Sequence, residues 1–417
     1  MNTVNYKNDA ELRKERKAEA KQLKRRRIEE DGGKRRRPGK FYSSASNESS
    51  TDREKVKRKQ TKDTTKRRFG RVMEKVPSIK RPRYSTVSIA LPTSIVQNCQ
   101  THELKTQLVG QISRACAIYH VDEVVIFDDH LGKEAKSAKD AAFMARILQY
   151  MECPQYLRRN FFPMHYDLKY AGLLCPLDAP HHVRVGEKSK YREGISLSDE
   201  KAGKTSTDTT SFVNIGVRIP VVVDRKIPPN VRCTVEVDIK DYDRPRRMKG
   251  KIVSPAAPRE DDGTYWGYTT RVAKSIAAAL KECPYEGGYD LKIGTSERGD
   301  INVDSVKFSF PTPQYKHLLI VFGGVAGIEE CVDADETLKV AGDDSRSLFD
   351  MWVNTCPFQG SRTIRTEEAV LISLARLRPY IAKNKEEHPQ NSTSMQRVDT
   401  NITFSDSASS EESSEDV

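Results

Sequence analysis

Three short segments near the end of the chain combine glycine with small polar residues, and each follows an apolar run typical of a buried strand. They are 294–299 (GTSERG), 323–329 (GGVAGIE) and 354–365 (NTCPFQGSRTIR). In open α/β sheets, ligands bind beyond the carboxyl ends of the strands, where glycine lets the backbone approach a ligand closely. One glycine-rich turn after a strand is more often only a turn, but three in succession predict one shared pocket.

The same segments disfavour two common classes of ligand. They contain neither the G-x-G-x-x-G opening of a dinucleotide site nor the Lys-Ser/Thr ending of a P-loop. Binding driven by phosphate groups is therefore not expected. A ligand held largely by backbone groups, such as an adenosyl amino acid, fits these loops better.

The hydrophobic pattern predicts the elements that carry the loops. An α/β alternation begins with a strand at 84–91 and a helix opened by Pro92. It is interrupted by short β-rich runs broken by Gly, Pro and Asp, which suit a small barrel. The further predicted elements are helix 104–118, strand 121–128, helix 138–151, β runs 213–224, 231–239 and 248–255, strand 265–270, helix 271–281, strands 289–294, 317–322 and 348–353, and helix 366–378.

Neither α/β piece alone has enough strands for a sheet that is covered on both faces. We therefore expect one α/β domain split into 77–170 and 259–382 by an all-β insertion at 171–258. Residues 1–76 contain almost no bulky apolar side chains and are predicted to be a disordered basic tail. Residues 383–417 are predicted to be a disordered acidic, serine-rich tail.

Charge is concentrated in these tails. Residues 1–83 contain 29 Lys and Arg against 12 Asp and Glu, whereas residues 384–417 contain 2 against 8. The basic excess predicts an arm that follows polyanions with salt-dependent affinity. The blocks Lys24–Arg27 and Lys34–Pro38 have the layout of a bipartite nuclear import signal, and a nonspecific RNA-binding tail is a compatible alternative. The acidic tail is either a kinase substrate or a solvated tail without a specific role.

The eight cysteines occur singly, without a C-x-x-C pair or a zinc-finger histidine spacing, so neither a metal site nor a disulfide framework is expected. This usage fits a reducing compartment. The first residues are charged where a signal peptide is apolar, and no run reaches the ~18 apolar residues of a transmembrane helix. We expect a soluble intracellular protein without a membrane partner.

The strings GTSERG, VFGGVAGIEE and NTCPFQGSRTIRTEEAVLISLA, with the upstream VSIALPTSIVQNCQTHELKTQLVGQISRACAIYHVDEVVIFDD, resemble SPOUT-class RNA methyltransferases that carry an OB-fold-like insertion. The resemblance covers residues 70–382. It implies a parallel sheet with a deep C-terminal trefoil knot, bound S-adenosyl-L-methionine, and a homodimer. It also implies ribosomal RNA as substrate, with uridine N3 as acceptor, and a nuclear, nucleolar location. The human member of the family adds spindle and kinetochore proteins as candidate partners.

On this resemblance, the cofactor-binding residues are expected in the three loops: Thr295, Ser296, Glu297, Arg298, Gly299, Phe322, Gly323, Gly324, Val325, Gly327, Asn354, Thr355, Cys356, Gln359, Gly360, Ser361, Thr363 and Ile364. Methyl transfer from a sulfonium is an in-line displacement, so the protein mainly aligns the acceptor and handles its proton. Arg365 and Arg362 are the first candidates for this work, because Arg stabilises a deprotonated base or holds a phosphate. Their alternative role is a salt bridge to Glu367 or Glu368.

Residues 110–115 (GQISRA) resemble the G-x-x-x-R part of the G-x-x-x-R-x-A motif of SPOUT tRNA ribose methyltransferases, in which a helix carries the catalytic Arg just before a strand. The match makes Arg114 a third catalytic candidate that would complete the pocket. Position 109 is Val where that motif has Asn, which speaks against ribose 2′-hydroxyl chemistry. A surface or ion-paired helix residue is the alternative for Arg114.

Within the insertion, Tyr191 with Arg184, Lys188, Lys190 and Arg192 is the best candidate for contacts with nucleic acid, and a solvated charged loop is the alternative.

Two further clusters have ordinary structural explanations. His181 and His182 lack further ligands at metal spacing, and the aromatic run 265–268 is expected in the core rather than stacked on bases.

Two other functions compete with methyl transfer. The first is a non-catalytic ribosome-assembly or spindle factor that keeps the SPOUT scaffold for docking, since a fold can outlive its chemistry. The second is a simple OB-fold RNA binder, in which residues 171–258 would suffice.

Overall fold

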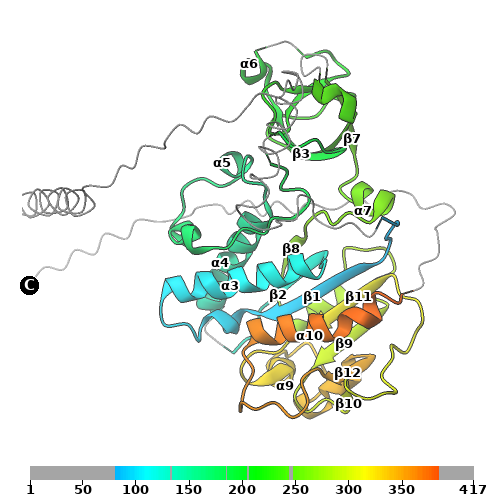
Figure 1. The fold of residues 1–417 in the computed structure, drawn as a ribbon. Helices are drawn as coiled ribbons and strands as arrows, with labels where there is room; N and C mark the ends of the chain where they lie inside the picture. Colours follow the sequence, from blue (N-terminus) through cyan, green and yellow to red (C-terminus); the bar gives the residue numbers. More distant parts are fainter. Residues whose placement is uncertain (1–79, 132–133, 185, 204–205, 244–247, 385–417) are drawn as a thin grey trace, which may run out of the picture. The chain divides into compact units, whose positions relative to one another are not determined.

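The computed structural model describes residues 80–131, 134–184, 186–203, 206–243 and 248–384. Its centre is a parallel sheet with strand order β10-β12-β9-β11-β1-β2-β8 (Figure 1). These strands are β1 Thr86–Pro92, β2 Glu123–Phe127, β8 Thr269–Ala273, β9 Leu291–Thr295, β10 Ile301–Asn302, β11 His317–Val321 and β12 Met351–Asn354. The predicted parallel sheet is confirmed, whereas the predicted basic tail, its two basic blocks and nearly all of the acidic tail lie outside the described residues.

Helices cover both faces of this sheet. α3 (His102–Ile118), α4 (Glu134–Glu152) and α10 (Thr366–Ile381) pack on one face, together with Val87, Ile89 and Leu91 of β1. α8 (Ile276–Lys281) and α9 (Gly327–Asp333) pack on the other face. Burial on both sides explains why the strands have nearly continuous apolar sequences.

A second, smaller sheet closes into a barrel with strand order β3-β4-β5-β7-β6, which confirms the predicted all-β insertion. The strands are β3 Tyr191–Leu197, β4 Ser211–Asn214, β5 Val221–Val223, β6 Arg232–Val237 and β7 Lys249–Val253. Val213, Val221 and Val235 belong to its core. The remaining short helices are η1 Thr93–Val96, α5 Arg158–Phe161, η2 Tyr166–Leu168, η3 Ala171–Leu173, α6 Asp199–Ala202, η4 Ile239–Asp243, α7 Ala257–Asp262 and η6 Gly342–Leu348.

The prediction for 265–281 is wrong in its boundaries. Residues 271–273 belong to strand β8, and the helix begins only at Ile276. The Ser275 side chain accepts a hydrogen bond from Ala278 N and thereby fixes the start of α8. Gly267 turns the chain before the strand with φ +83°. β3, β10 and α9 were not predicted, and the single run 213–224 contains two antiparallel strands, β4 and β5.

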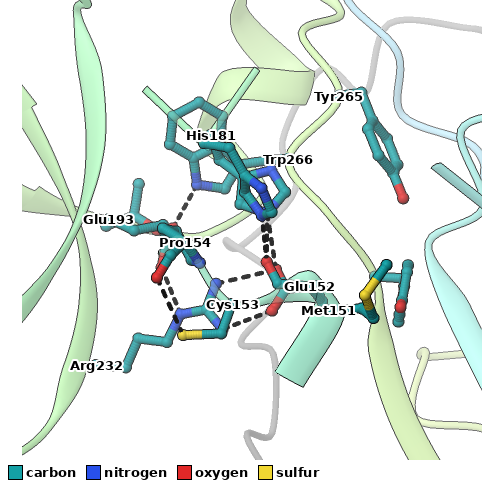
Figure 2. A network of polar contacts seen from close by, with 12 residues as sticks. Met151, Glu152, Cys153, Pro154, His181, Glu193, Arg232, Tyr265 and Trp266 are labelled. Carbon is teal, nitrogen blue, oxygen red and sulfur yellow. Dashed lines mark hydrogen bonds and ion pairs between the residues drawn. The ribbon is translucent and has the colours of Figure 1, made fainter. Parts of the chain in front are cut away.

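A buried network of charges links the end of α4 to the barrel (Figure 2). The Arg232 guanidinium donates to both carboxylate oxygens of Glu152, at 2.6 and 2.9 Å, and its Nε donates to Glu193 at 2.7 Å. The His181 Nε2 atom lies 3.2 Å from Glu152 Oε1. The Trp266 indole donates to Glu193. The network therefore joins β3 and β6 to residues of the larger domain.

His317, the first residue of β11, makes stability depend on pH. Its side chain is only 1% exposed, and its Nδ1 lies 2.8 Å from Thr86 Oγ1. Burial lowers the pKa of His317 to about 4. The pKa of His317 is lower in the folded chain than in the unfolded chain, where it is ~6.5. As the pH falls from 6.5 toward 4, the unfolded chain therefore takes up a proton before the folded chain does. The contribution of His317 to the free energy of unfolding is complete above pH ~6.5 and is lost over this range.

Urea denaturation of wild-type protein and of His317→Gln at pH 7 and pH 5 tests this. We expect the wild type to lose about 2 kcal/mol more unfolding free energy over this interval than the variant. Equal losses would contradict a role for His317.

Candidate active site

The three glycine-containing loops emerge from three adjacent strands. They follow β9, β11 and β12, which are neighbours in the order β12-β9-β11. Because all these pairs are parallel, the loops leave the sheet at the same edge. The sheet therefore brings together the segments that the sequence predicts to form one pocket.

The first and third loops are held against each other by backbone contacts. The Asn354 side chain donates to Glu297 O at 2.8 Å, and Ser296 N donates to Val353 O at 3.1 Å. A Cβ atom on Gly299 would lie 2.2 Å from Asn354 N, a distance that real structures do not allow. Only glycine fits at position 299.

The second loop is a tight turn with equally little room. A Cβ on Gly323 would lie 2.4 Å from the carbonyl carbon of Gly327, which itself has φ +89°. Gly323 O accepts a hydrogen bond from Thr366 Oγ1 at 3.1 Å, at the start of α10. Ser296 Oγ donates to Glu329 Oε1 at 3.2 Å, so the second loop is also tied to the first.

The third loop is shaped by its own side chains. Asn354 Oδ1 accepts from Cys356 N at 3.0 Å, and the Gln359 amide donates to the carbonyls of Ser361 and Arg362. Gly360 differs from the other glycines of the three loops, because a Cβ there would meet nothing within 4 Å.

The predicted cofactor residues differ in how far they reach the surface. Phe322 is buried, and its N–H donates to Ala90 O at 3.0 Å. Thr295 Oγ1 donates to Val321 O at 2.9 Å. The exposed members are Glu297, Arg298, Val325, Gly360, Ser361 and Thr363; the half-buried members are Thr295, Ser296, Gly299, Gly323, Gly324, Gly327, Asn354, Thr355, Cys356, Gln359 and Ile364.

Arg362 and Arg365 lie at the end of the third loop. Arg362 is exposed, and its guanidinium has no hydrogen-bond or ion-pair partner among the described residues. Arg365 pairs through Nε with Glu367 at 2.7 Å, while 58% of its side chain remains exposed. Its Nη2 lies 3.9 Å from Cys99 Sγ, on the turn between η1 and α3. The pair with Glu367 is the predicted salt bridge, and it leaves an edge of the guanidinium open.

The structure does not bring Arg114 to these loops. α3 runs back from the carboxyl edge of the sheet, so Arg114, in its last turn, lies near the amino end of β2. The Arg114 guanidinium donates to Pro176 O at 2.9 Å and Leu177 O at 2.7 Å. Within one chain, Arg114 therefore holds the segment that precedes the barrel and does not complete the pocket.

Three residues at the site were not predicted. Thr366 binds Gly323 O, Ser94 Oγ would lie 2.8 Å from a Cβ on Gly324, and Cys99 contacts Arg365. Thr366 directly follows the candidate Arg365, so its position in the sequence could have indicated it. Nothing in the sequence pairs positions 94 and 99 with loops more than 200 residues later.

The proposed aromatic and basic cluster of the barrel is not a free surface, because Tyr191 and Arg192 are buried in β3. Lys188 pairs with Asp243 and Lys190 with Asp261, and Arg184 pairs with Asp178. A stacking role for Tyr191 is therefore wrong.

The aromatic run 265–268 is confirmed as core, since Tyr265, Trp266 and Tyr268 are all buried. His181 and His182 both direct Nε2 at Glu152 O, at 2.8 and 2.7 Å. No group of three His, Cys, Asp or Glu side chains in the described residues is arranged to hold a metal ion. No helix in the described part of the chain is long and apolar enough to cross a membrane.

Comparison with known proteins gives the family. A family model described as "Putative RNA methyltransferase" matches residues 86–377. The chain belongs to this family. A human protein named 28S rRNA (uridine-N(3))-methyltransferase is 48% identical over 319 residues, which cover 74% of this chain and 82% of the human protein. A Drosophila melanogaster protein of the same name is 45% identical over 336 residues, covering 75% and 67% of the two chains. The expected membership in a family of RNA methyltransferases is confirmed, and the protein is an RNA methyltransferase.

Proposed function

We propose that this protein transfers the methyl group of S-adenosyl-L-methionine to N3 of a uridine in large-subunit ribosomal RNA. The observation that carries the proposal is the meeting of three loops at one sheet edge, with two exposed arginines beside them. The 48% identity to a 28S rRNA (uridine-N(3))-methyltransferase supports the choice of acceptor.

The chemistry of the loops fits the cofactor. They present backbone groups of Gly323, Gly324 and Gly327 and the half-buried apolar side chain of Ile364, which suit an adenine ring. The carboxylate of Glu297 is exposed at the first loop and suits an ammonium group. When bound, S-adenosyl-L-methionine supplies an activated methyl group.

The acceptor side requires the removal of a proton and control of charge. Uridine N3 carries a hydrogen, so the ring becomes negatively charged at O2 and O4 as that proton passes to water. A guanidinium is always protonated and stabilises such charge without taking the proton itself. Arg362 has no side-chain partner in the part of the chain that the structure describes, and Arg365 is oriented by Glu367, so both guanidinium groups can donate to the ring or an adjacent phosphate.

Replacing either arginine should impair methyl transfer or RNA binding without changing the affinity for the cofactor. We expect Arg365→Ala to lower kcat about 100-fold, the order seen when one charge-stabilising donor is removed. Arg362→Ala should act mainly on KM for RNA if it holds a phosphate. Mass spectrometry of ribosomal nucleosides measures N3-methyluridine, with Arg184→Ala as a control far from the loops. An unchanged nucleoside profile in the Arg365→Ala variant would count against this role.

The proposal includes a C-terminal knot and a homodimer. β10 lies beyond β12 in the sheet although it comes between β9 and β11 in the chain. Gly299, which precedes β10, packs against Asn354 at the end of β12. The chain therefore crosses itself at this edge of the sheet, which supports the proposed knot. Leu371 of α10 and Ile118 of α3 are exposed apolar residues on two helices in contact, which supports a dimer face. Nuclear and nucleolar location follows from the two basic blocks and the ribosomal substrate.

A further inference from the structure

A group of exposed aromatic and basic side chains lies on the segment between α5 and η3. It consists of the exposed Tyr166 and Lys169, the half-buried Tyr170 and the exposed apolar Met164, here named the aromatic platform. Met164 is fully exposed and 66% of Tyr166 is exposed. Large apolar and aromatic side chains in water are ordinary when scattered singly, but a cluster of them marks an interaction site.

The two tyrosine rings of the platform are held in place by His102 and Lys169. The His102 ring lies 4.8 Å from the Tyr166 ring and 5.6 Å from the Tyr170 ring. Lys169 Nζ lies 5.9 and 5.1 Å from the centres of the same two rings. The ring faces and one cation are therefore already arranged, and binding would cost little side-chain entropy.

The nearby carboxylates already have partners, and one of them, Glu103, also interacts electrostatically with the Lys169 ammonium. Asp167 pairs with Arg146, which also contacts His165. A hydrogen bond from Tyr170 lowers the pKa of Glu103, so that carboxylate is engaged with the tyrosine hydroxyl. The faces of the rings and the Lys169 ammonium are what the platform offers to a partner.

The platform lies at the same end of the sheet as the three loops. His102 begins α3, which follows the carboxyl end of β1 through η1. Cys99, three residues before His102, lies 3.9 Å from the Arg365 guanidinium. The contact of Arg365 with Cys99, the short backbone stretch 99–102 and the contacts of His102 with the tyrosine rings thus connect Arg365 to the platform.

We propose that the aromatic platform binds unpaired nucleotides of the RNA that flank the acceptor uridine. Aromatic faces with a nearby cation are how proteins hold single-stranded RNA, because every base has a face to stack and every nucleotide a phosphate. The proposal rests on the proposed function for the identity of the RNA. It assigns the large domain an RNA contact of its own, in addition to any made by the barrel or the basic tail.

Fluorescence anisotropy with the full chain and a labelled 12-nucleotide single-stranded oligouridine tests the platform without cofactor. We expect Tyr166→Ala to weaken binding about 10- to 100-fold, the effect of losing one stacked base. Tyr166→Phe keeps the ring and should bind like wild type. Lys169→Ala should reduce the slope of log affinity against log salt by about 1. Val306→Ala, a fully exposed apolar residue elsewhere, is the matched control and should change nothing.

The cofactor affinity of Tyr166→Ala, measured by calorimetry, should equal that of wild type, and its KM for RNA should rise with kcat unchanged. Wild-type oligouridine affinity in Tyr166→Ala, or an equal loss in Tyr166→Phe, would overturn the proposal. So would a change in oligomeric state on sedimentation with RNA binding intact, which would indicate a protein partner. If the wild type binds RNA through Tyr166 but forms no methyluridine, the proposed function fails and the platform stands.

Discussion

Gly323→Ala is expected to lower the affinity for S-adenosyl-L-methionine by at least about 100-fold while the sheet stays folded. The added Cβ would lie 2.4 Å from the Gly327 carbonyl carbon and 2.5 Å from Ile328 N. Both are backbone atoms, so the second loop must move as a whole, and a displacement of about 1 Å at a binding site can cost 10²-fold. Calorimetry with the cofactor measures the loss.

Gly172→Ala is the matched control, because it adds the same methyl group outside the three loops, at a position where nothing lies within 4 Å. It should bind the cofactor like wild type. Wild-type affinity in Gly323→Ala, or an equal loss in both variants, would contradict a cofactor site at the second loop.

Arg232→Ala should lower the free energy of unfolding by about 3–5 kcal/mol, the usual cost of removing one partner of a buried charge pair. Glu152 is almost fully buried, which by itself opposes its ionisation. The Arg232 guanidinium outweighs burial and holds the pKa of Glu152 well below its usual range. Without Arg232, Glu152 and Glu193 lose the cation between them (Figure 2).

Urea denaturation measures this change, with Arg184→Ala as the control. The Arg184–Asp178 pair is mostly exposed, and such pairs contribute little because water and salt screen them. Arg184→Ala should unfold at the wild-type urea concentration. If both variants unfold alike, the network is not a structural link between the barrel and the larger domain.

Much of the sheet could be predicted because its strands are buried on both faces. The apolar runs at 84–91, 121–128, 289–294 and 317–322 correspond to β1, β2, β9 and β11. Their parallel order places the three loops at one edge, so the meeting of these loops was predictable. The short strands predict a barrel, but the basic residues around Tyr191 suggest an exposed charged cluster, Arg184, Lys188, Lys190 and Arg192, and so hide strand β3.

The partners of individual side chains could not be predicted. Arg192 and Arg232 have the residue type of a surface, and only the fold shows that hydrogen bonds satisfy them inside the protein. Arg114 matches a catalytic motif locally, yet the direction of α3 carries it away from the loops. Local sequence thus predicted which residues could do the chemistry, whereas long-range pairing decided which of them meet.

The proposed methyl transfer is tested most directly by incubating the full chain with large-subunit ribosomal RNA and S-adenosyl-L-methionine that is labelled in its methyl group. The nucleosides of the RNA are then analysed by mass spectrometry. Methyl transfer to uridine N3 should place the label in N3-methyluridine, and no label is expected with Gly323→Ala. Label in another nucleoside would contradict the acceptor, and unlabelled RNA with a folded, cofactor-binding wild type would contradict methyl transfer to ribosomal RNA.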